Sequence, residues 1–288
     1  MKQRHADYQV IPYPKYRRWM VGGYRWAARH KHLVHGLFEV DVTGARAALR
    51  EHEAKTGESL SFTAFLIACL AKAVDEHKAV HAYRKGGTHL ILFDDVDIYT
   101  VIEHDMAGEK YIIPHVIRAA NRKTVHELHH EIRAAQGVDV KNVLKEFWPL
   151  RLPTVFFRPF FWAFGRIGGW RPRVLKQISG TVGITAIGMF GSGAGWGIPP
   201  ATPTTLMLAV GGIGEKQVMV DGRTTMREYL SLTISVDHDV VDGAPAARFT
   251  RRLKELIESG YGLGDVTEEP ERAGAEGASA RQVNATRA

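Results

Sequence analysis

The sequence is nearly devoid of cysteine and lacks a hydrophobic leader. Cys69 is the only cysteine in 288 residues, so no disulfide can form within the chain and an oxidising compartment is not indicated. The first residues, MKQRHADYQVIPYPKYRRW, are charged and contain proline, with no apolar run behind them. They do not resemble a secretory signal. Both absences favour a cytoplasmic protein.

The sequence also lacks the uninterrupted run of about 20 apolar residues that a transmembrane helix requires. The segment Phe147 to Trp170 comes nearest, because it holds nine of the chain's 27 aromatic residues. Arginines and prolines interrupt it, at Arg151, Arg158, Arg166, Pro149, Pro153 and Pro159. Nine aromatic side chains close together need a surface that covers them. We therefore expect the segment to contact another protein, with a membrane surface as the alternative.

The net charge of +7 comes from scattered Lys and Arg residues, and no helix-turn-helix, zinc-finger or RNA-binding motif accompanies it. We therefore expect no nucleic acid partner. An anionic membrane or the phosphates of a nucleotide-based ligand would suit the basic excess, and a solvated basic surface explains it equally well. Charge alone leaves these interpretations open.

Hydrophobic periodicity predicts strands and helices in one large α/β unit. Strands are predicted at 36–42, 89–103, 110–120, 180–188, 204–213, 217–222 and 227–237. Helices are predicted at 43–57, 59–77, 124–136 and 243–259. Thr43 is the candidate N-cap of the first helix and Gly57 lies beyond its end, while the second helix is apolar enough to be buried.

Two histidine groups have spacings that metal ligands could use: His126, His129 and His130 in one predicted helix, and His30, His32 and His35 before the first strand. No obvious acidic or cysteine partner follows the first group at a ligand spacing. A solvated helix face is the preferred interpretation of that group, and a cation-rich loop that of the second. We therefore expect no bound metal.

Two glycine-rich stretches invite comparison with ligand-binding loops. GGIGEK, at 211–216, lacks the spacing of a Walker loop and stands between two predicted strands, so a hairpin turn is preferred. GSGAGWG, at 191–197, follows a strand and is interpreted as a loop, with close approach to a ligand as the alternative.

The stretch SVDHDVVDGAPAARF, at 235–249, places a histidine and carboxylates between the last predicted strand and the last predicted helix. A histidine at such a junction can be partly shielded yet reachable, as a general base must be. His238 is therefore the candidate base, and Asp242, beside Gly243, could fix the loop or orient the imidazole. On spacing alone, an Asp-Gly turn and a helix cap explain all of the stretch except His238.

The same stretch, read on as DHDVVDGAPAARFTRRLKELIE, resembles the His-x-x-x-Asp-Gly signature of the acyltransferase core component of 2-oxoacid dehydrogenase complexes, which is shared with chloramphenicol acetyltransferase. Five further stretches are similar in the same order: FEVDVTGARAALR, LSFTAFLIACLAKAVDEH, IIPHVIRAANRKTVHELHHEI, GTVGITAIGMFG and LMLAVGGIGEKQVMVDG. The resemblance extends from about His30 to about Gly260. Six collinear blocks make it specific.

This resemblance implies a chloramphenicol-acetyltransferase-like α/β fold, a two-layer sandwich of mixed β-sheet and helices. It implies a homotrimer, alone or in a larger cage, with active sites between subunits. The implied reaction transfers an acyl group between a lipoyl or pantetheine thiol and coenzyme A. His238 then matches the general base, Asp242 the loop-stabilising aspartate, and Thr185 of GITAIG the hydroxyl that hydrogen-bonds the oxyanion from the opposite subunit.

The sequence departs from the family pattern close to these residues: Asp239 replaces a usual arginine, Ala186 a frequent asparagine and Gly183 a threonine. The expected organisation is an N-terminal arm at 1–29, a catalytic domain at 30–263 with an aromatic-rich insertion at about 144–175, and a disordered tail at 264–288. No lipoyl lysine or subunit-binding domain is expected in this chain, and no coenzyme-binding residues are identified. We predict a stand-alone acyltransferase, with a non-catalytic trimeric scaffold and a membrane-surface protein as alternatives.

Overall fold

The computed structural model describes residues 3–4, 8–10, 13, 15–106, 109–138, 172–186 and 193–264. Its strands are β1 (Gln3–Arg4), β2 (Gln9–Val10), β3 (Leu33–Asp41), β4 (Tyr83–Lys85), β5 (His89–Ile91), β6 (Ile98–Met106), β7 (Glu109–Ile117), β8 (Val182–Ala186), β9 (Leu206–Val220) and β10 (Arg223–Asp237). Its helices are α1 (Lys15–His30), α2 (Thr43–Thr56), α3 (Phe62–Glu76), α4 (Val125–Gln136), α7 (Pro172–Ser179) and α8 (Gly243–Glu258), with short 3-10 turns at Lys78–His81 and Ala120–Arg122.

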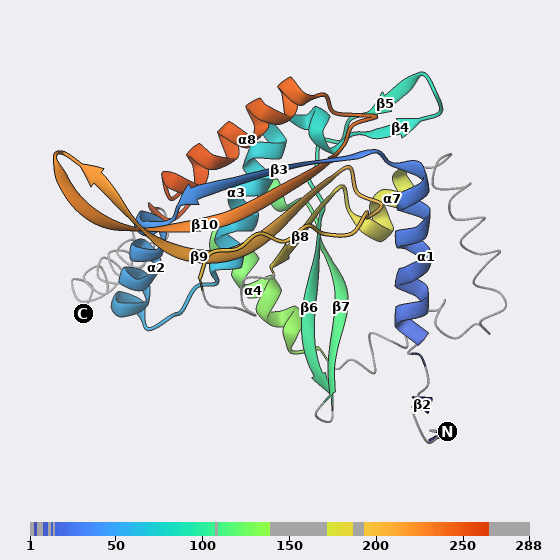
Figure 1. Ribbon diagram of the computed structural model, residues 1–288, viewed down its shortest axis with the longest axis horizontal. Coiled ribbons are helices and arrows are strands. Elements are labelled where there is room, and N and C mark those ends of the chain that lie inside the picture. The colour runs from blue at the N-terminus through green and yellow to red at the C-terminus, as the bar shows by residue number, and fades with distance from the viewer. Residues whose placement is uncertain are drawn as a thin grey trace, which may run out of the picture.

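A mixed six-stranded sheet, in the order β3-β10-β9-β8-β6-β7, organises the molecule (Figure 1). β8 runs parallel to both of its neighbours, β6 and β9, and the other pairs are antiparallel. β1 with β2, and β4 with β5, form separate two-stranded ribbons. The sheet places β10, its last strand in the sequence, beside β3, its first.

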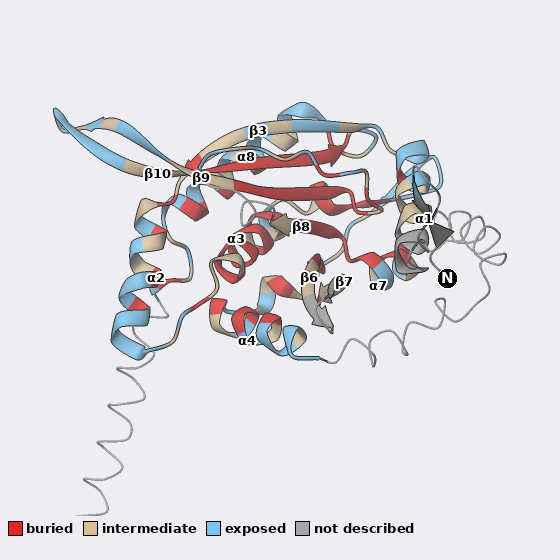
Figure 2. Ribbon diagram, turned by 60° about the horizontal axis from the view of Figure 1, so that its bottom comes forward, coloured by how far each residue is buried: buried red, intermediate tan, exposed pale blue. Residues whose placement is uncertain are grey.

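The helix α3 is the centre of the second layer, between α4 and α8 (Figure 1). Ser61 caps it, because its side chain accepts a hydrogen bond from the Ala64 N–H. Almost every position from Ala64 to Val74 is buried, and Figure 2 shows the buried residues gathered in α3 and the middle of the sheet. The apolar composition that predicted a buried helix here is therefore confirmed. Cys69 belongs to this core, and burial raises the pKa of its thiol.

One long strand, β9, replaces two predicted ones, and this corrects the interpretation of GGIGEK. Those residues lie inside β9, where 213–216 pair with β10 and the register shifts at Gly211 and Gly212, so they form no hairpin turn. The turn is Asp221-Gly222, where both residues have positive φ, 50° and 74°, as a tight β-hairpin requires. The glycines matter because residues 193–195 pack directly on this strand: the Gly212 N–H donates to the Gly195 carbonyl at 2.9 Å.

The start of α2 differs from the sequence prediction in its capping residue. The N-cap is Val42, and no side chain caps the helix. The Thr43 hydroxyl instead accepts a hydrogen bond from the Glu228 N–H of β10 at 2.8 Å, because β10 passes the first turn of the helix and its backbone needs an acceptor there. The other end is as predicted, with Gly57 at φ 77° closing the helix.

The helix α1 lies within the segment that the sequence suggested was only an arm, and its Ala27 is fully buried. The aromatic segment Phe147 to Trp170 and the predicted tail beyond Gly264 lie outside the described residues. The boundaries proposed for arm, insertion and tail therefore stay predictions. Within the described parts of the chain, no helix combines the length and apolar character needed to cross a membrane.

Candidate active site

The turn between β10 and α8 brings His238 to the surface. Residues 231–237 are buried, whereas His238 is exposed in the single chain. Its N–H donates to the carbonyl of His32 at 2.8 Å, which fixes the backbone of the turn against the start of β3. The imidazole therefore stands where the buried strand ends, and it is open to solvent in the single chain.

Asp237 anchors the turn. Its carbonyl accepts hydrogen bonds from the N–H groups of Val240 and Val241 at 2.9 and 3.0 Å, and its Oδ1 accepts from the Asp239 N–H at 3.3 Å. Its Oδ2 accepts from Lys31 Nζ at 2.9 Å, and both side chains are nearly excluded from water. Burial lowers the pKa of Lys31, while the charge of Asp237 opposes that shift. Asp237, buried and paired with Lys31, therefore fixes the start of the turn that carries the His238 imidazole.

Asp239, the departure from the family pattern, holds the outer side of the turn. Its carboxylate contacts Arg84 Nη1 at 2.6 Å and His32 Nδ1 at 2.9 Å. The hydrogen bond from His32, and then the charge of Arg84, keep the pKa of Asp239 below its usual value. Arg84 and Asp239 also line a hollow of about 420 Å³ beside the β4–β5 ribbon. β4 therefore supplies a guanidinium next to the position where the family usually has one.

Asp242 does not hold this loop in the single chain. It is the residue before α8, its side chain is exposed and forms no cap, and its carbonyl accepts the Ala246 N–H at 3.1 Å. Among the described residues its carboxylate has no hydrogen-bond or ion-pair partner. Asp237 holds the turn in the single chain, and the role predicted for Asp242 stays a prediction.

Thr185 is half-buried on β8 and lies far from His238. It pairs with Ala209 of β9, which pairs in turn with Thr233 of β10. The chain from Thr233 to His238 spans about 17 Å at the usual rise of a strand. One chain therefore does not bring Thr185 and His238 together, and a site that uses both must draw them from two chains.

The histidines near β3 have separate partners. His30 Nδ1 lies 2.7 Å from the Trp26 carbonyl, His32 binds Asp239, and His35 Nδ1 lies 2.7 Å from Ser235 Oγ. His35 also belongs to β3 instead of the predicted loop. These side chains do not converge on a common point, so this group offers no metal site.

The histidines of α4 differ from the prediction of a solvated helix face. His129 is buried, and its Nδ1 accepts a hydrogen bond from the Ser61 N–H at 2.9 Å. Burial lowers the pKa of His129, with the nearby Arg133 charge acting in the same direction. His130 remains exposed. The prediction is therefore wrong for His129, because α4 packs this side toward the α2–α3 loop.

Sequence reasoning missed three residues that build the candidate site: Lys31, Arg84 and Asp237. Asp237 carries a local signal, because a carboxylate at the end of a buried strand needs a partner. Lys31 and Arg84 carry none, since they lie 206 and 155 residues from the aspartates that they contact.

A family comparison covers most of the chain. Residues 5–145 and 174–263 match the model described as 2-oxoacid dehydrogenases acyltransferase (catalytic domain). The match begins inside the segment predicted as an arm and is interrupted between residues 145 and 174. It includes the turn that carries His238.

Curated relatives are components of 2-oxoacid dehydrogenase complexes. The lipoamide acyltransferase component of the branched-chain alpha-keto acid dehydrogenase complex of Bacillus subtilis is 26% identical over 228 residues, which cover 77% of this chain and 46% of that protein. The chain thus spans about half the length of the curated relatives that it matches.

Solved structures share the fold. Dihydrolipoamide acetyltransferase of Azotobacter vinelandii, from a study of the role of a serine, a histidine and an asparagine in its catalytic mechanism, has a TM-score of 0.64 at 20% identity, over 88% of this chain and 93% of that one. The cubic core of the pyruvate dehydrogenase multienzyme complex has a TM-score of 0.63 at 21% identity, over 90% of this chain and 96% of that one.

These likenesses confirm the predicted fold class, a mixed sheet layered with helices. They also agree with the resemblance drawn from the six sequence blocks. Because the family match extends over both sides of the interruption and through the His238 turn, the chain belongs to the 2-oxoacid dehydrogenases acyltransferase (catalytic domain) family.

Proposed function

We propose that the protein transfers an acyl group between a lipoyl- or pantetheine-like thiol and coenzyme A. The observation that carries the proposal is the exposed His238 on a turn fixed by the buried Lys31–Asp237 pair, in a chain of this family. The curated relatives are named as acyltransferase components. We extend the acyltransferase activity of these relatives to this chain because His238 stands on that turn.

In the proposed mechanism His238 is the general base. A thiol with a pKa of about 8.5 needs only a nearby neutral imidazole to become a strong nucleophile. The imidazole takes the thiol proton while the sulfur attacks the thioester carbonyl and a new C–S bond forms. As the tetrahedral intermediate collapses, the old C–S bond breaks and the imidazolium returns the proton to the departing thiolate. No covalent enzyme intermediate is required.

Thr185 is the proposed hydrogen-bond donor to the oxyanion. Loss of one such donor costs about 2.7–4 kcal/mol of transition-state stabilisation. In the Azotobacter vinelandii enzyme, the serine precedes the histidine by about as many residues as Thr185 precedes His238, and the asparagine follows it at the spacing of Asp242. These spacings support roles for both residues. The exposed Asp242 carboxylate is available to steady the site from across a subunit boundary.

The proposed site needs at least two chains, and we expect a homotrimer, alone or within a cage. The separation of Thr185 from His238 along the sheet supports a shared site. Exposed apolar side chains support association: Val34 and Leu37 on the edge strand β3, and Met219 and Met226 near the tip of the β9–β10 hairpin. The likeness to the cubic core favours an assembly beyond one chain.

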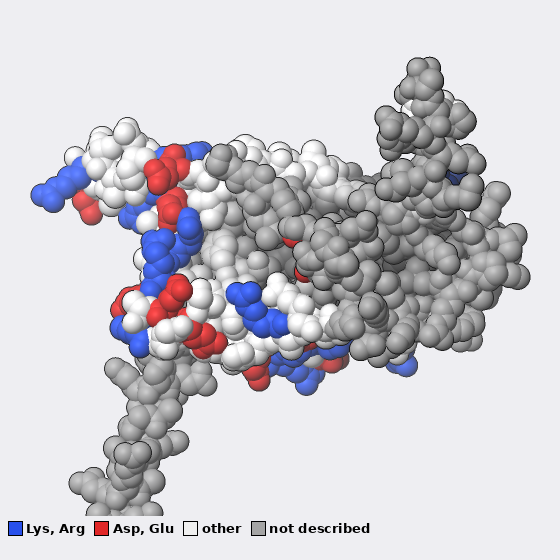
Figure 3. Space-filling view, turned by 90° about the horizontal axis from the view of Figure 1, so that it is seen from below, with Lys and Arg blue, Asp and Glu red and all other residues white. Residues whose placement is uncertain are grey.

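The charge on one face of the molecule gives no support for a nucleic acid partner. On the face seen in Figure 3, basic and acidic side chains alternate over the described residues and form no continuous basic patch. Local basic residues at an active-site channel would suit the phosphates of coenzyme A. The proposal retains a cytoplasmic location and no nucleic acid partner.

A non-catalytic scaffold is the competing function, and its support is the change of two family positions to Ala186 and Asp239. The deciding experiment measures thioester exchange between a panel of acyl-coenzyme A donors and free dihydrolipoamide or pantetheine. His238→Ala should lower the rate by roughly 10²–10⁴, with folding and coenzyme A binding retained. A wild type that exchanges nothing would favour the scaffold, and a variant as fast as an active wild type would show that His238 is not the base.

A further inference from the structure

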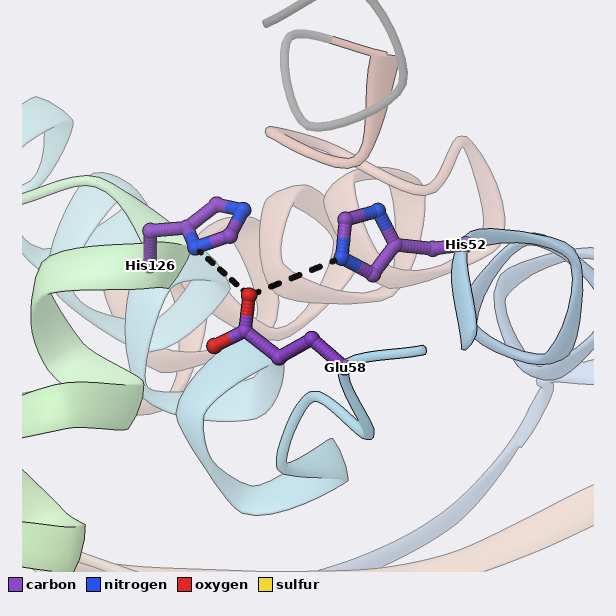
Figure 4. Close-up of side chains that lie close together, drawn as sticks. All are labelled: His52, Glu58 and His126. Carbon is purple, nitrogen blue, oxygen red and sulfur yellow. Dashed lines mark ion pairs between the residues drawn. The ribbon is translucent and has the colours of Figure 1, made fainter. Parts of the chain in front are cut away.

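Glu58, in the loop between α2 and α3, is surrounded by histidines from two helices. Its carboxylate oxygens lie 4.0 Å from His52 Nε2, 3.7 Å from His126 Nδ1, 3.8 Å from His129 Nε2 and 3.6 Å from His130 Nε2. Figure 4 shows the rings of His52 and His126 approaching the same oxygen from different sides. Segments far apart in the sequence thus aim nitrogen donors at one carboxylate.

The donor separations are close to those of a tetrahedral metal centre. Ligands bound to Zn²⁺ at 2.0–2.1 Å are about 3.3 Å from one another, and the ligand atoms of His52, Glu58 and His126 all lie within 4.8 Å of one another, so a small contraction brings them to that spacing. His130 is four residues from His126 on α4, but with ring centroids 6.0 Å apart it does not join this group of donors. The helix α2, the α2–α3 loop and α4 already place His52, Glu58 and His126 together.

His129 plays a different part. Its Nδ1 accepts the Ser61 N–H, so the proton of the neutral ring is on Nε2, the nitrogen that faces Glu58. A protonated Nε2 can donate to the carboxylate but cannot bind a metal. His129 is therefore a positioning residue that orients Glu58.

His52 is buried, with 3% of its surface exposed. Its Nε2 lies 3.2 Å from the Thr56 hydroxyl, whose single proton can go to this nitrogen or to the His52 carbonyl at 2.9 Å, so Nε2 can keep the lone pair that a metal needs. Its Nδ1 is buried without a hydrogen-bond partner among the described residues. Hydrogen bonding thus accounts for only one ring nitrogen of a histidine that is otherwise expensive to bury.

We propose that His52, Glu58 and His126 bind one divalent transition metal ion of the Zn²⁺ class, with water completing its coordination. Imidazole and carboxylate donors in this number suit such an ion. The proposal departs from the sequence-based expectation of no metal, because Glu58 and His52 are the partners that the HELHH stretch lacked locally.

The site is structural and separate from acyl transfer. α2 follows the end of β3 where Asp41 pairs with Tyr229, whereas the His238 turn is at the opposite end, where Leu33 pairs with Asp237. The ion would join α2, the α2–α3 loop and α4. Because an ion that binds only the folded state stabilises it, metal binding should raise the melting temperature.

The test titrates chelator-treated full-length protein with Co²⁺ and follows the visible absorption of a tetrahedral centre, then displaces Co²⁺ with Zn²⁺. We expect one ion per chain and a rise of about 5–10 °C in melting temperature at saturating Zn²⁺, reversed by EDTA. These readouts do not depend on acyl transfer. A failure of the metal proposal can therefore be told apart from a failure of the proposed function.

The variants are Glu58→Gln and His126→Asn, and the second keeps the site testable if the first fails to fold. Each should weaken binding by more than the 10–100-fold typical of losing a ligand's hydrogen-bond partner. His89→Asn, at an exposed histidine, is the matched control and should bind as wild type does. Absence of a stoichiometric Co²⁺ spectrum, or equal binding by His126→Asn and the control, would overturn the proposal.

Discussion

Lys31 Nζ lies 2.9 Å from Asp237 Oδ2, and this buried ion pair joins the chain before β3 to the last residue of β10. Removal of one partner from such a pair leaves an uncompensated buried charge and typically costs about 3–5 kcal/mol. Because Asp237 also accepts hydrogen bonds from the turn that follows, the pair connects the stability of the domain to the position of His238.

We expect Lys31→Met and Asp237→Asn each to lower the free energy of unfolding by about 3–5 kcal/mol. Asn keeps an acceptor at the position of Oδ1, so the Asp239 N–H stays satisfied. The double variant should be less destabilised than the sum of the two, since neither charge is left alone. Denaturant unfolding of all four proteins measures this coupling, and strictly additive losses would contradict the pairing.

Mixed assemblies test whether His238 and Thr185 act from different chains. His238→Ala and Thr185→Ala proteins should each be slow in thioester exchange. If each site takes one residue from each of two neighbours, random mixing of equal amounts should restore about a quarter of the sites. The measurement is the exchange rate after subunit exchange in mild denaturant. Activity that stays at the level of the separate variants would mean that both residues serve within one chain, or that one is not catalytic.

His81 should make the domain sensitive to acid. It is fully buried, its Nδ1 lies 2.9 Å from Thr181 Oγ1, and its Nε2 has no partner among the described residues. Burial lowers its pKa from 6.5 to about 4. The unfolded chain therefore binds the proton more readily, so the stability that His81 contributes is present above pH 6.5 and is lost as the pH falls toward 4.

The shift corresponds to about 3 kcal/mol. His81→Gln removes this titration, so its free energy of unfolding should decline by about that much less than that of wild type between pH 6.5 and pH 4. Unfolding curves at several pH values measure the difference. The exposed His89→Gln should decline as steeply as wild type, and equal slopes for all three proteins would show that His81 is not the sensitive group.

Gly183 explains one departure from the family pattern. A Cβ added there would lie 2.2 Å from Met207 Sδ, and Met207 is buried. Gly183→Thr should therefore destabilise the domain by about 1–3 kcal/mol through overpacking. Adding Met207→Ala should recover part of the loss by opening space. Thermal unfolding of the single and double variants checks this, and a neutral Gly183→Thr would contradict the close contact.

The sequence alone determined those features that depend on neighbouring residues. The apolar run of α3, the alternation in β10 and the helical spacing of α8 placed His238 at a strand-to-helix turn, because periodicity records which face of a segment is buried. The ordered blocks identified the family. GGIGEK misled because glycine is typical of turns, whereas here its small size lets residues 193–195 pack on a continuous strand.

Tertiary structure decided whatever depends on contacts between distant segments. No local pattern connects Lys31 with Asp237, Arg84 with Asp239 or Glu58 with the histidines of α4. The sheet order put β3 beside β10 and left Thr185 far from His238. The physical reason is that a charge or hydrogen-bond donor is satisfied by whichever group the packed fold brings within reach, and sequence separation does not limit that reach.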